Sequence, residues 1–504
     1  MLLKSINYFF VIIIITIIAH FIPFERASLA PDDYAFYKHH NLWIKNFIYY
    51  PDRPLQFLWY EIQNLLINDN ISIAFSFLII ANIIFSTICF YFINFFFNKQ
   101  TSFLIIIINI LLFNKLEIYH NAIMIHIVIV STLYLISLFL LVNYINNKKN
   151  NYLILSLITY TISIFWYEIG FFLPLIIFFH SYKNKKLTFN FRLFDYFYNK
   201  LIIFSPFLLI MFFYLTLRIT NIFGYAMADE SHSLIYNPFH GIYDIFQHYF
   251  GRYAIKNIIY GILQFQKLNF IYIIFFVIAN LSFGIFIFIF LKKNKQIFIK
   301  YENFIFFILL FLFSLIPMIL NGQSGGRNLL LATISISVFI YYIFFSIRKY
   351  QNLIFSIFVI LLLFISEGNS WSQVQASKIQ SKILNTILRN EEKIHNSQYL
   401  IFNTKSLSEN IEYSLVDNDY NMFNTYFGAQ VWEVWGLKGF LNKNKIKTNL
   451  IIINENPIIN NKSLTLNKVV DVINYKVIVE ETDVSTEDIF IIEYKNIFIN
   501  NEKK

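Results

Sequence analysis

The chain has 504 residues, of which 57% are hydrophobic and only 14% are charged, and its formal net charge is +10. Soluble domains carry about 25% charged residues, so this composition excludes an ordinary soluble globular protein. Cysteine occurs once, at Cys89, which excludes an intramolecular disulfide and argues against a cysteine-ligated metal site. Positive cytoplasmic loops explain the charge better than nucleic-acid binding does, so no nucleic-acid partner is expected.

Repeated apolar runs of about 18 residues or more predict a polytopic α-helical membrane protein. The first run predicts an uncleaved helix over about 6–23, because Pro31 directly follows the one plausible signal-peptide cleavage site, Ala27 to Ala30. Residues 55–66 form an amphipathic segment that is expected to lie in the membrane interface. Further helices are predicted over about 71–97, 101–114, 122–145, 152–166, 171–181 and 201–222.

The second half of the membrane region begins with a long polar loop, predicted over about 223–267. Four more helices are predicted over about 268–291, 304–320, 329–346 and 353–366. The total is about eleven membrane-spanning helices, which assigns residues 1–367 to a transmembrane domain.

From about residue 368 the composition becomes that of a small α/β domain, which covers residues 368–504. An amphipathic helix is predicted over 371–394, and strands over 399–402, 449–454, 469–480 and 488–499. Lysine and arginine concentrate in the loops that face the cytoplasm if the N-terminus lies there. With that orientation the first loop, the turns at Glu117, Glu168 and Arg327, and the C-terminal domain all face outward.

The first outward loop, 26–61, is the main candidate for chemistry. Asp32 and Asp33 fit a general base that activates a hydroxyl group. The alternative is structural, because Pro31 suits a first helical turn and acids there complement the helix dipole. Arg53 suits bidentate binding of a lipid phosphate, or else a local ion pair at a turn. His39 and His40 either bind phosphate or acceptor, or form a solvated pair.

Polar residues at later outward turns are further candidates. Glu117 with His120, and Tyr167 with Glu168, place carboxylates near hydrocarbon, where they are costly and often functional. Either carboxylate suits hydrogen bonding to sugar hydroxyls, or is simply in water. Arg327 opens a helix after Gly325 and Gly326, which predicts an anion site.

Together these pieces resemble the GT-C superfamily of membrane glycosyltransferases, most closely the bacterial glucosyltransferase-II group that modifies O-antigen. The resemblance covers residues 1–367 and rests on Asp32-Asp33-Tyr34 in the first outward loop, Arg53-Pro54-Leu55, Tyr167-Glu168 and Gly326-Arg327. It implies an integral protein of the bacterial inner membrane, with Tyr34 among the substrate-binding residues.

The resemblance also implies a mechanism. The donor is a sugar on polyprenyl phosphate, and the acceptor is a surface glycan or a lipid-linked glycan. Asp33 or Asp32 deprotonates the acceptor hydroxyl, which attacks the anomeric carbon with inversion. Asp33 is preferred, because Asp32 directly follows Pro31 and suits a purely structural turn. Arg327, Arg53 or a histidine stabilises the departing phosphate. No cofactor is expected, and a divalent metal is left open.

Other functions compete with this interpretation. An oligosaccharide polymerase, or a transferase acting on protein or lipid A, differs in the acceptor, which the sequence does not indicate. A flippase or transporter of lipid-linked glycans is expected to place charged residues along its helices and to contain inverted repeats. A structural membrane protein does not need the Asp32-Asp33 loop.

Overall fold

The computed structural model describes residues 8–20, 25–30, 33–34, 53–67, 70–176, 192–220, 238–293, 301–321, 326–346, 350–397, 399–403, 423–426, 429–453, 458–460, 463–466, 471–473, 476–478, 482–485 and 489–492. The first part is helical: α1 (Tyr8–His20), α4 (Pro54–Ile67), α5 (Ile71–Asn94), α6 (Lys99–Leu111), α7 (Glu117–His120), α8 (Ile125–Asn147), α9 (Asn150–Ile164), α11 (Arg192–Thr220), α12 (Pro238–Tyr249), α13 (Arg252–Gln266), α14 (Phe270–Lys293), α15 (Tyr301–Asn321), α16 (Leu330–Ser346), α17 (Gln351–Arg389) and α18 (Glu391–Asn396). Short 3₁₀ turns complete it: η4 (Phe113–Lys115), η5 (Ala122–Met124), η6 (Glu168–Gly170), η7 (Leu173–Ile176) and η10 (Gly326–Leu329).

Within the described ranges, four segments are long and apolar enough to cross a membrane: Ile71–Asn94, Ala122–Asn147, Phe270–Lys293 and Gln351–Arg389. Shorter apolar helices lie at Tyr8–His20, Lys99–Leu111, Leu201–Leu217, Phe304–Ile319 and Leu330–Ser346. Each of these segments coincides with a run that the sequence predicts to be helical and apolar. The chain therefore has the make-up of a helical membrane protein, while the total of about eleven spans stays a prediction.

The polar loop predicted over 223–267 is wrong for its second part, which contains α12 and α13. Apolar residues recur there at helical spacing, although histidine, glutamine and lysine between them lower the mean hydropathy. The helix predicted over 171–181 is also wrong in its described part, 171–176, where Pro174 interrupts the pattern and the 3₁₀ turn η7 forms in its place. The interfacial segment at 55–66 is helical, as α4.

One helix, α17, covers the segment predicted over 353–366 and most of the segment predicted over 371–394, whose last residues belong to the short helix α18. It runs without a break through residues 367 and 368, where the sequence predicts the boundary between the two domains. Gly368 does not end it, because this glycine lies against the backbone of Gly261 in α13 and allows the two helices to pack closely.

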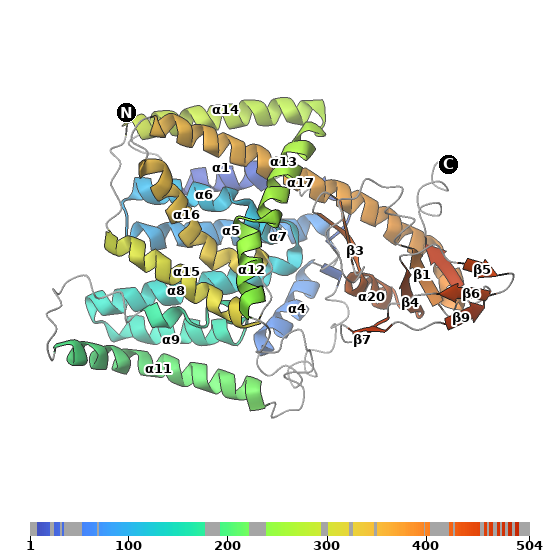
Figure 1. The fold of residues 1–504 in the computed structure, drawn as a ribbon, viewed down its shortest axis with the longest axis horizontal. Helices are drawn as coiled ribbons and strands as arrows, with labels where there is room; N and C mark the ends of the chain where they lie inside the picture. The colour runs from blue at the N-terminus through green and yellow to red at the C-terminus, as the bar shows by residue number, and fades with distance from the viewer. Residues whose placement is uncertain are drawn as a thin grey trace.

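Figure 1 shows that most helices lie side by side in one bundle. The helices α12 and α13 run across the others near one end of the bundle, and α17 extends past that end to the C-terminal strands. The connection between α6 and α8, made of η4, α7 and η5, lies at the same end. At this end of the bundle, the described residues at the start of the first loop contact α17 and the C-terminal part.

The C-terminal part contains a parallel sheet in the order β10-β1-β4, formed by β1 (Tyr399–Asn403), β4 (Asn449–Ile453) and β10 (Ile489–Ile492). The helix α20 (Val434–Lys443) packs with it through Phe440 and Leu441. Smaller antiparallel sheets are formed by β2 (Phe423–Tyr426) with β3 (Ala429–Glu433), by β5 (Ile458–Asn460), β6 (Ser463–Leu466) and β9 (Thr482–Ser485), and by β7 (Asp471–Ile473) with β8 (Lys476–Ile478). The strands predicted at β1, β4 and β10 are confirmed, whereas the single strand predicted over 469–480 is the hairpin β7-β8.

Candidate functional site

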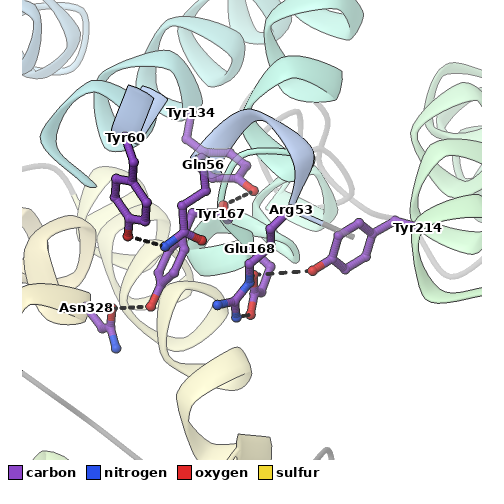
Figure 2. Close-up of polar contacts among 8 residues, drawn as sticks. All are labelled: Arg53, Gln56, Tyr60, Tyr134, Tyr167, Glu168, Tyr214 and Asn328. Carbon is purple, nitrogen blue, oxygen red and sulfur yellow. Dashed lines mark hydrogen bonds and ion pairs between the residues drawn. The ribbon is translucent and has the colours of Figure 1, made fainter. Parts of the chain in front are cut away.

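The best-defined polar group at this end of the bundle is an ion pair between Arg53 and Glu168 (Figure 2). The Arg53 Nε donates to Glu168 Oε2 at 2.9 Å, and Nη2 donates to Oε1 of the same carboxylate. The guanidinium carbon also lies 4.7 Å from the centre of the Tyr167 ring. The two charged side chains are 11% and 16% exposed, so the pair is partly shielded and is held in a bidentate geometry.

Further side chains complete this Arg53 cluster, which we define as Arg53, Tyr134, Tyr167, Glu168, Tyr214 and Asn328. The Tyr214 hydroxyl in α11 donates to Glu168 Oε2 at 3.3 Å. The Tyr167 hydroxyl donates to Asn328 Oδ1 at 3.3 Å, and the Tyr134 hydroxyl donates to the carbonyl oxygen of Tyr167 at 2.9 Å. Segments from the first loop, α8, the turn after α9, α11 and η10 therefore meet at one place.

Local sequence explains how these side chains are held. Pro54 opens α4 directly after Arg53, which suits proline because the first helical N–H has no partner inside the helix. The turn that carries Glu168 packs tightly on α8, since a Cβ atom at Gly170 would lie only 2.5 Å from the Tyr134 ring. A side chain at residue 170 would push the turn, and Glu168 with it, away from Arg53.

Aromatic rings border the cluster. The His126 ring lies 5.4 Å from the Tyr60 ring and 5.8 Å from the Tyr167 ring, both at nearly perpendicular angles. Trp59 and Trp166 lie 5.7 Å apart, between centroids. Such rings offer apolar faces with polar edges. These faces and edges suit a ligand that has both apolar and hydroxyl-bearing sides.

Asp33 lies elsewhere at this end of the bundle and is fully buried, with an exposed fraction of 0%. Its Oδ2 accepts from the Ala30 backbone N–H at 2.8 Å, and its Oδ1 accepts from the Ile123 N–H at 2.7 Å. Burial raises the pKa of Asp33 to about 6, although these N–H groups and Arg26 act in the opposite direction. Because the carboxylate is enclosed and its oxygens are occupied, this arrangement favours the structural interpretation, in which Asp33 anchors its segment to η5, directly before α8.

Three other residues of this region, Arg26, Tyr34 and His120, are also buried. Arg26, which sequence reasoning did not single out, donates through Nη1 to the carbonyl oxygen of His120. The His120 ring is buried, with Nε2 3.4 Å from the Ser370 hydroxyl, and burial holds its pKa well below the usual range. His120 is therefore a neutral packing residue here, and it does not lie in the Arg53 cluster. Tyr34 packs edge-on against Phe440, at 5.5 Å, on the side of the C-terminal sheet.

The remaining predicted residues lie wholly or partly outside the described residues. Asp32, His39 and His40 lie outside the described residues. Glu117 and Arg327 have described backbone, in α7 and η10, but their side chains lie outside the description. Arg327 is nevertheless adjacent in sequence to Asn328, which bonds Tyr167. Among the residues that are described, no three of histidine, cysteine, aspartate and glutamate are grouped closely enough to share a metal ion.

The Arg53 guanidinium presents two parallel N–H donors, and in this structure both are occupied by the Glu168 carboxylate. Arginine uses this fork geometry to bind carboxylates and phosphates. Comparison with family models gives no match, and searches of curated proteins and of solved structures give no match either.

Proposed function

We propose that this chain is a membrane glycosyltransferase that moves a sugar from a polyprenyl-phosphate donor to a surface glycan or lipid-linked acceptor, with inversion. One observation carries the proposal. Arg53, the Tyr167-Glu168 pair and the segment next to Arg327 are far apart in the sequence, yet they meet in one cluster. Arg53 and the Tyr167-Glu168 pair belong to two of the four motifs on which the resemblance to GT-C enzymes rests, and Asn328 directly follows a third, Gly326-Arg327.

The cluster supports a role in binding the donor phosphate. A sugar linked to a lipid through a phosphodiester carries one negative charge there, and the departing lipid phosphate carries a second. A bidentate arginine stabilises this added charge more in the transition state than in the bound donor. Arg53 would receive the phosphate in place of the Glu168 carboxylate, and Tyr214 and Tyr167 offer further hydroxyl groups nearby.

The acceptor hydroxyl needs a base as it attacks the anomeric carbon. Asp33 is enclosed in this conformation, so we assign the general-base role to its neighbour Asp32 and an anchoring role to Asp33. The proton passes from the acceptor hydroxyl to the Asp32 carboxylate, and the electron pair of the broken glycosidic bond leaves with the phosphate.

The proposal includes a location. The chain is placed in the bacterial inner membrane, with the N-terminus in the cytoplasm and the Arg53 cluster and C-terminal sheets outside. The excess of lysine and arginine in the inward loops supports this orientation. Membrane lipids would then surround the apolar helices, and the donor would enter sideways from the bilayer.

A flippase of lipid-linked glycans is the second candidate, because two ionisable groups are fully buried within the bundle. Glu367 in α17 accepts a hydrogen bond from Asn280 at 2.8 Å, and the Lys115 ammonium donates to Asn109 at 2.8 Å. Ionisable groups inside a membrane region often line transport pathways. A transporter would move the intact lipid-linked glycan and would cleave no glycosidic bond.

Mass spectrometry of surface glycans tests the proposal in cells. Cells that contain the wild-type protein are expected to carry one additional sugar residue, which is lost when the protein is absent or carries Arg53→Ala. Loss of whole glycan chains, with every remaining chain of normal composition, would support the flippase instead.

A further inference from the structure

The first loop is held by α17, the helix that also carries the C-terminal sheets. The backbone N–H of Ala27 donates to Ser377 Oγ at 3.0 Å. The Ser28 hydroxyl lies 3.0 Å from the Ser377 carbonyl oxygen and 2.8 Å from Gln380 Oε1. Ser28, Ser377 and Gln380 are all buried, so each polar group depends on these partners and not on water.

The same stretch is anchored on its opposite side. Asp33 accepts the Ile123 N–H in η5, and Arg26 donates to the carbonyl oxygen of His120 at the end of α7. Residues 25–30 and 33–34, which we call the first-loop segment, are thus connected to the bundle on one side and to α17 on the other. In the sequence, Asp32 falls between two anchored residues of this segment, Ala30 and Asp33.

Apolar packing extends the contact to the C-terminal sheets. Leu29 and Tyr34 belong to one buried cluster with Ile383 and Ile387 of α17 and with Phe440 of α20. In Figure 1, α17 continues past the bundle and reaches the strands. The C-terminal part is therefore built onto the first-loop segment and is not attached through a linker alone.

We propose that the far half of α17, backed by the C-terminal sheets, positions the first-loop segment for the transfer reaction. Ser28, Ser377 and Gln380 are its positioning residues. This inference rests on the proposed function, and it gives the C-terminal part a role in catalysis, because that part would hold the described residues on either side of the proposed base. Errors of about 1 Å in such placement can cost about 10²-fold in rate.

The kinetic test uses full-length protein in detergent. Ser28→Ala and Gln380→Met each remove the contact between Ser28 and Gln380 while keeping side-chain size similar. We expect kcat for sugar transfer to fall about tenfold or more, and KM for the polyprenyl-phosphate donor to stay within about twofold, because the Arg53 cluster does not touch these residues. Asn385→Ala, at an exposed position on the same helix, serves as the matched control and should change neither constant.

A second readout does not depend on activity. Cys89 is the one native cysteine and is buried, so Ala30→Cys in a Cys89→Ala background gives a single reporter thiol in the first-loop segment. Position 30 is buried, so the thiol introduced by Ala30→Cys should react slowly with a maleimide. Adding Ser28→Ala or Gln380→Met should raise the labelling rate several-fold, and adding Asn385→Ala should not.

The two readouts separate the possible failures. Faster labelling together with a lower kcat supports the inference. If the labelling rate of the Ser28→Ala and Gln380→Met variants is unchanged, α17 does not hold the first-loop segment. If these variants are labelled faster but keep a normal kcat, the contact holds the segment without affecting the reaction. Either result overturns the inference. If wild-type protein transfers no sugar, the proposed function fails, and the labelling rates alone decide whether α17 holds the segment.

Discussion

Asp33 illustrates how burial changes what a carboxylate can do. In an unfolded chain an aspartate has a pKa of about 3.9, whereas burial raises the pKa of Asp33 to about 6. The folded protein therefore binds this proton more tightly than the unfolded chain does. The stability that comes from protonated Asp33 is fully present below about pH 4 and is lost as the pH rises through about 6.

This shift leads to a pH-dependent prediction for Asp33→Asn. The amide keeps one acceptor oxygen, but its NH₂ group cannot accept from the second backbone N–H, so the variant should be less stable by about 1–3 kcal/mol at acidic pH. Because asparagine does not titrate, the difference in melting temperature between the two proteins should narrow from about pH 4 to about pH 6.5 and then stay constant. Thermal unfolding in detergent measures this difference in melting temperature. A difference that stays the same from about pH 4 to about pH 6.5 would show that Asp33 does not titrate in this range.

The Arg53 pair yields a prediction about chemistry. Arg53→Ala should lower sugar transfer by about 10²–10³-fold, because it removes the group that stabilises the leaving phosphate. Arg53→Lys keeps the charge but loses the two-pronged geometry, so it should retain intermediate activity. Transfer rates at equal membrane levels provide the measurement, with Arg389→Ala at the exposed end of α17 as the control. If Arg53→Ala keeps full activity, the ion pair between Arg53 and Glu168 has a structural role only.

Among the helix contacts, the crossing of α13 and α17 depends on two glycines, Gly261 in α13 and Gly368 in α17. A Cβ atom at Gly368 would overlap the carbonyl oxygen of Gly261, which is backbone and cannot rotate away. A Cβ atom at Gly284 in α14 would meet the Ile360 Cδ1, and that end of a flexible side chain can move. Gly368 and Gly284 therefore form a matched pair for substitution.

Gly368→Ala should destabilise the protein by about 1–3 kcal/mol or more, because the two helices must separate to accept the methyl group. Gly284→Ala should cost much less, since Ile360 can change rotamer. Melting temperatures of both variants in one detergent supply the comparison. Equal melting temperatures of the two variants would mean that α13 and α17 lie far enough apart to accept a methyl group at residue 368.

The sequence predicts the apolar helices well, because length and hydropathy are local properties. The sequence does not predict α12 and α13, because polar residues on these helices lower the mean hydropathy and the segment is taken for a loop. It also selects Arg53, Tyr167 and Glu168 as candidates without pairing them, because 115 residues separate Arg53 from Glu168 and only the fold brings them together. The enclosure of Asp33 depends in the same way on η5, which is 90 residues away in the sequence, so no local pattern indicates it.

At the scale of the whole molecule, orientation decides whether the proposed chemistry is possible. An alkaline phosphatase reporter joined after Ser397 should be active, because α17 is expected to end outside the cytoplasm. The same reporter joined after Asn98, in the turn between α5 and α6, should be inactive. The reverse pattern would place the Arg53 cluster in the cytoplasm and would exclude a donor in the outer leaflet.

Sugar transfer can be measured with purified protein and a defined polyprenyl-phosphate sugar in detergent, where no membrane is present and flipping cannot contribute. We expect wild-type protein to form a new glycosidic bond to an acceptor glycan and to release polyprenyl phosphate in equal amount. Asp32→Asn should transfer about 10²–10⁴-fold more slowly, as expected for loss of a general base. Wild-type protein that binds the donor but releases no polyprenyl phosphate with any acceptor sugar would show that this chain is not a glycosyltransferase.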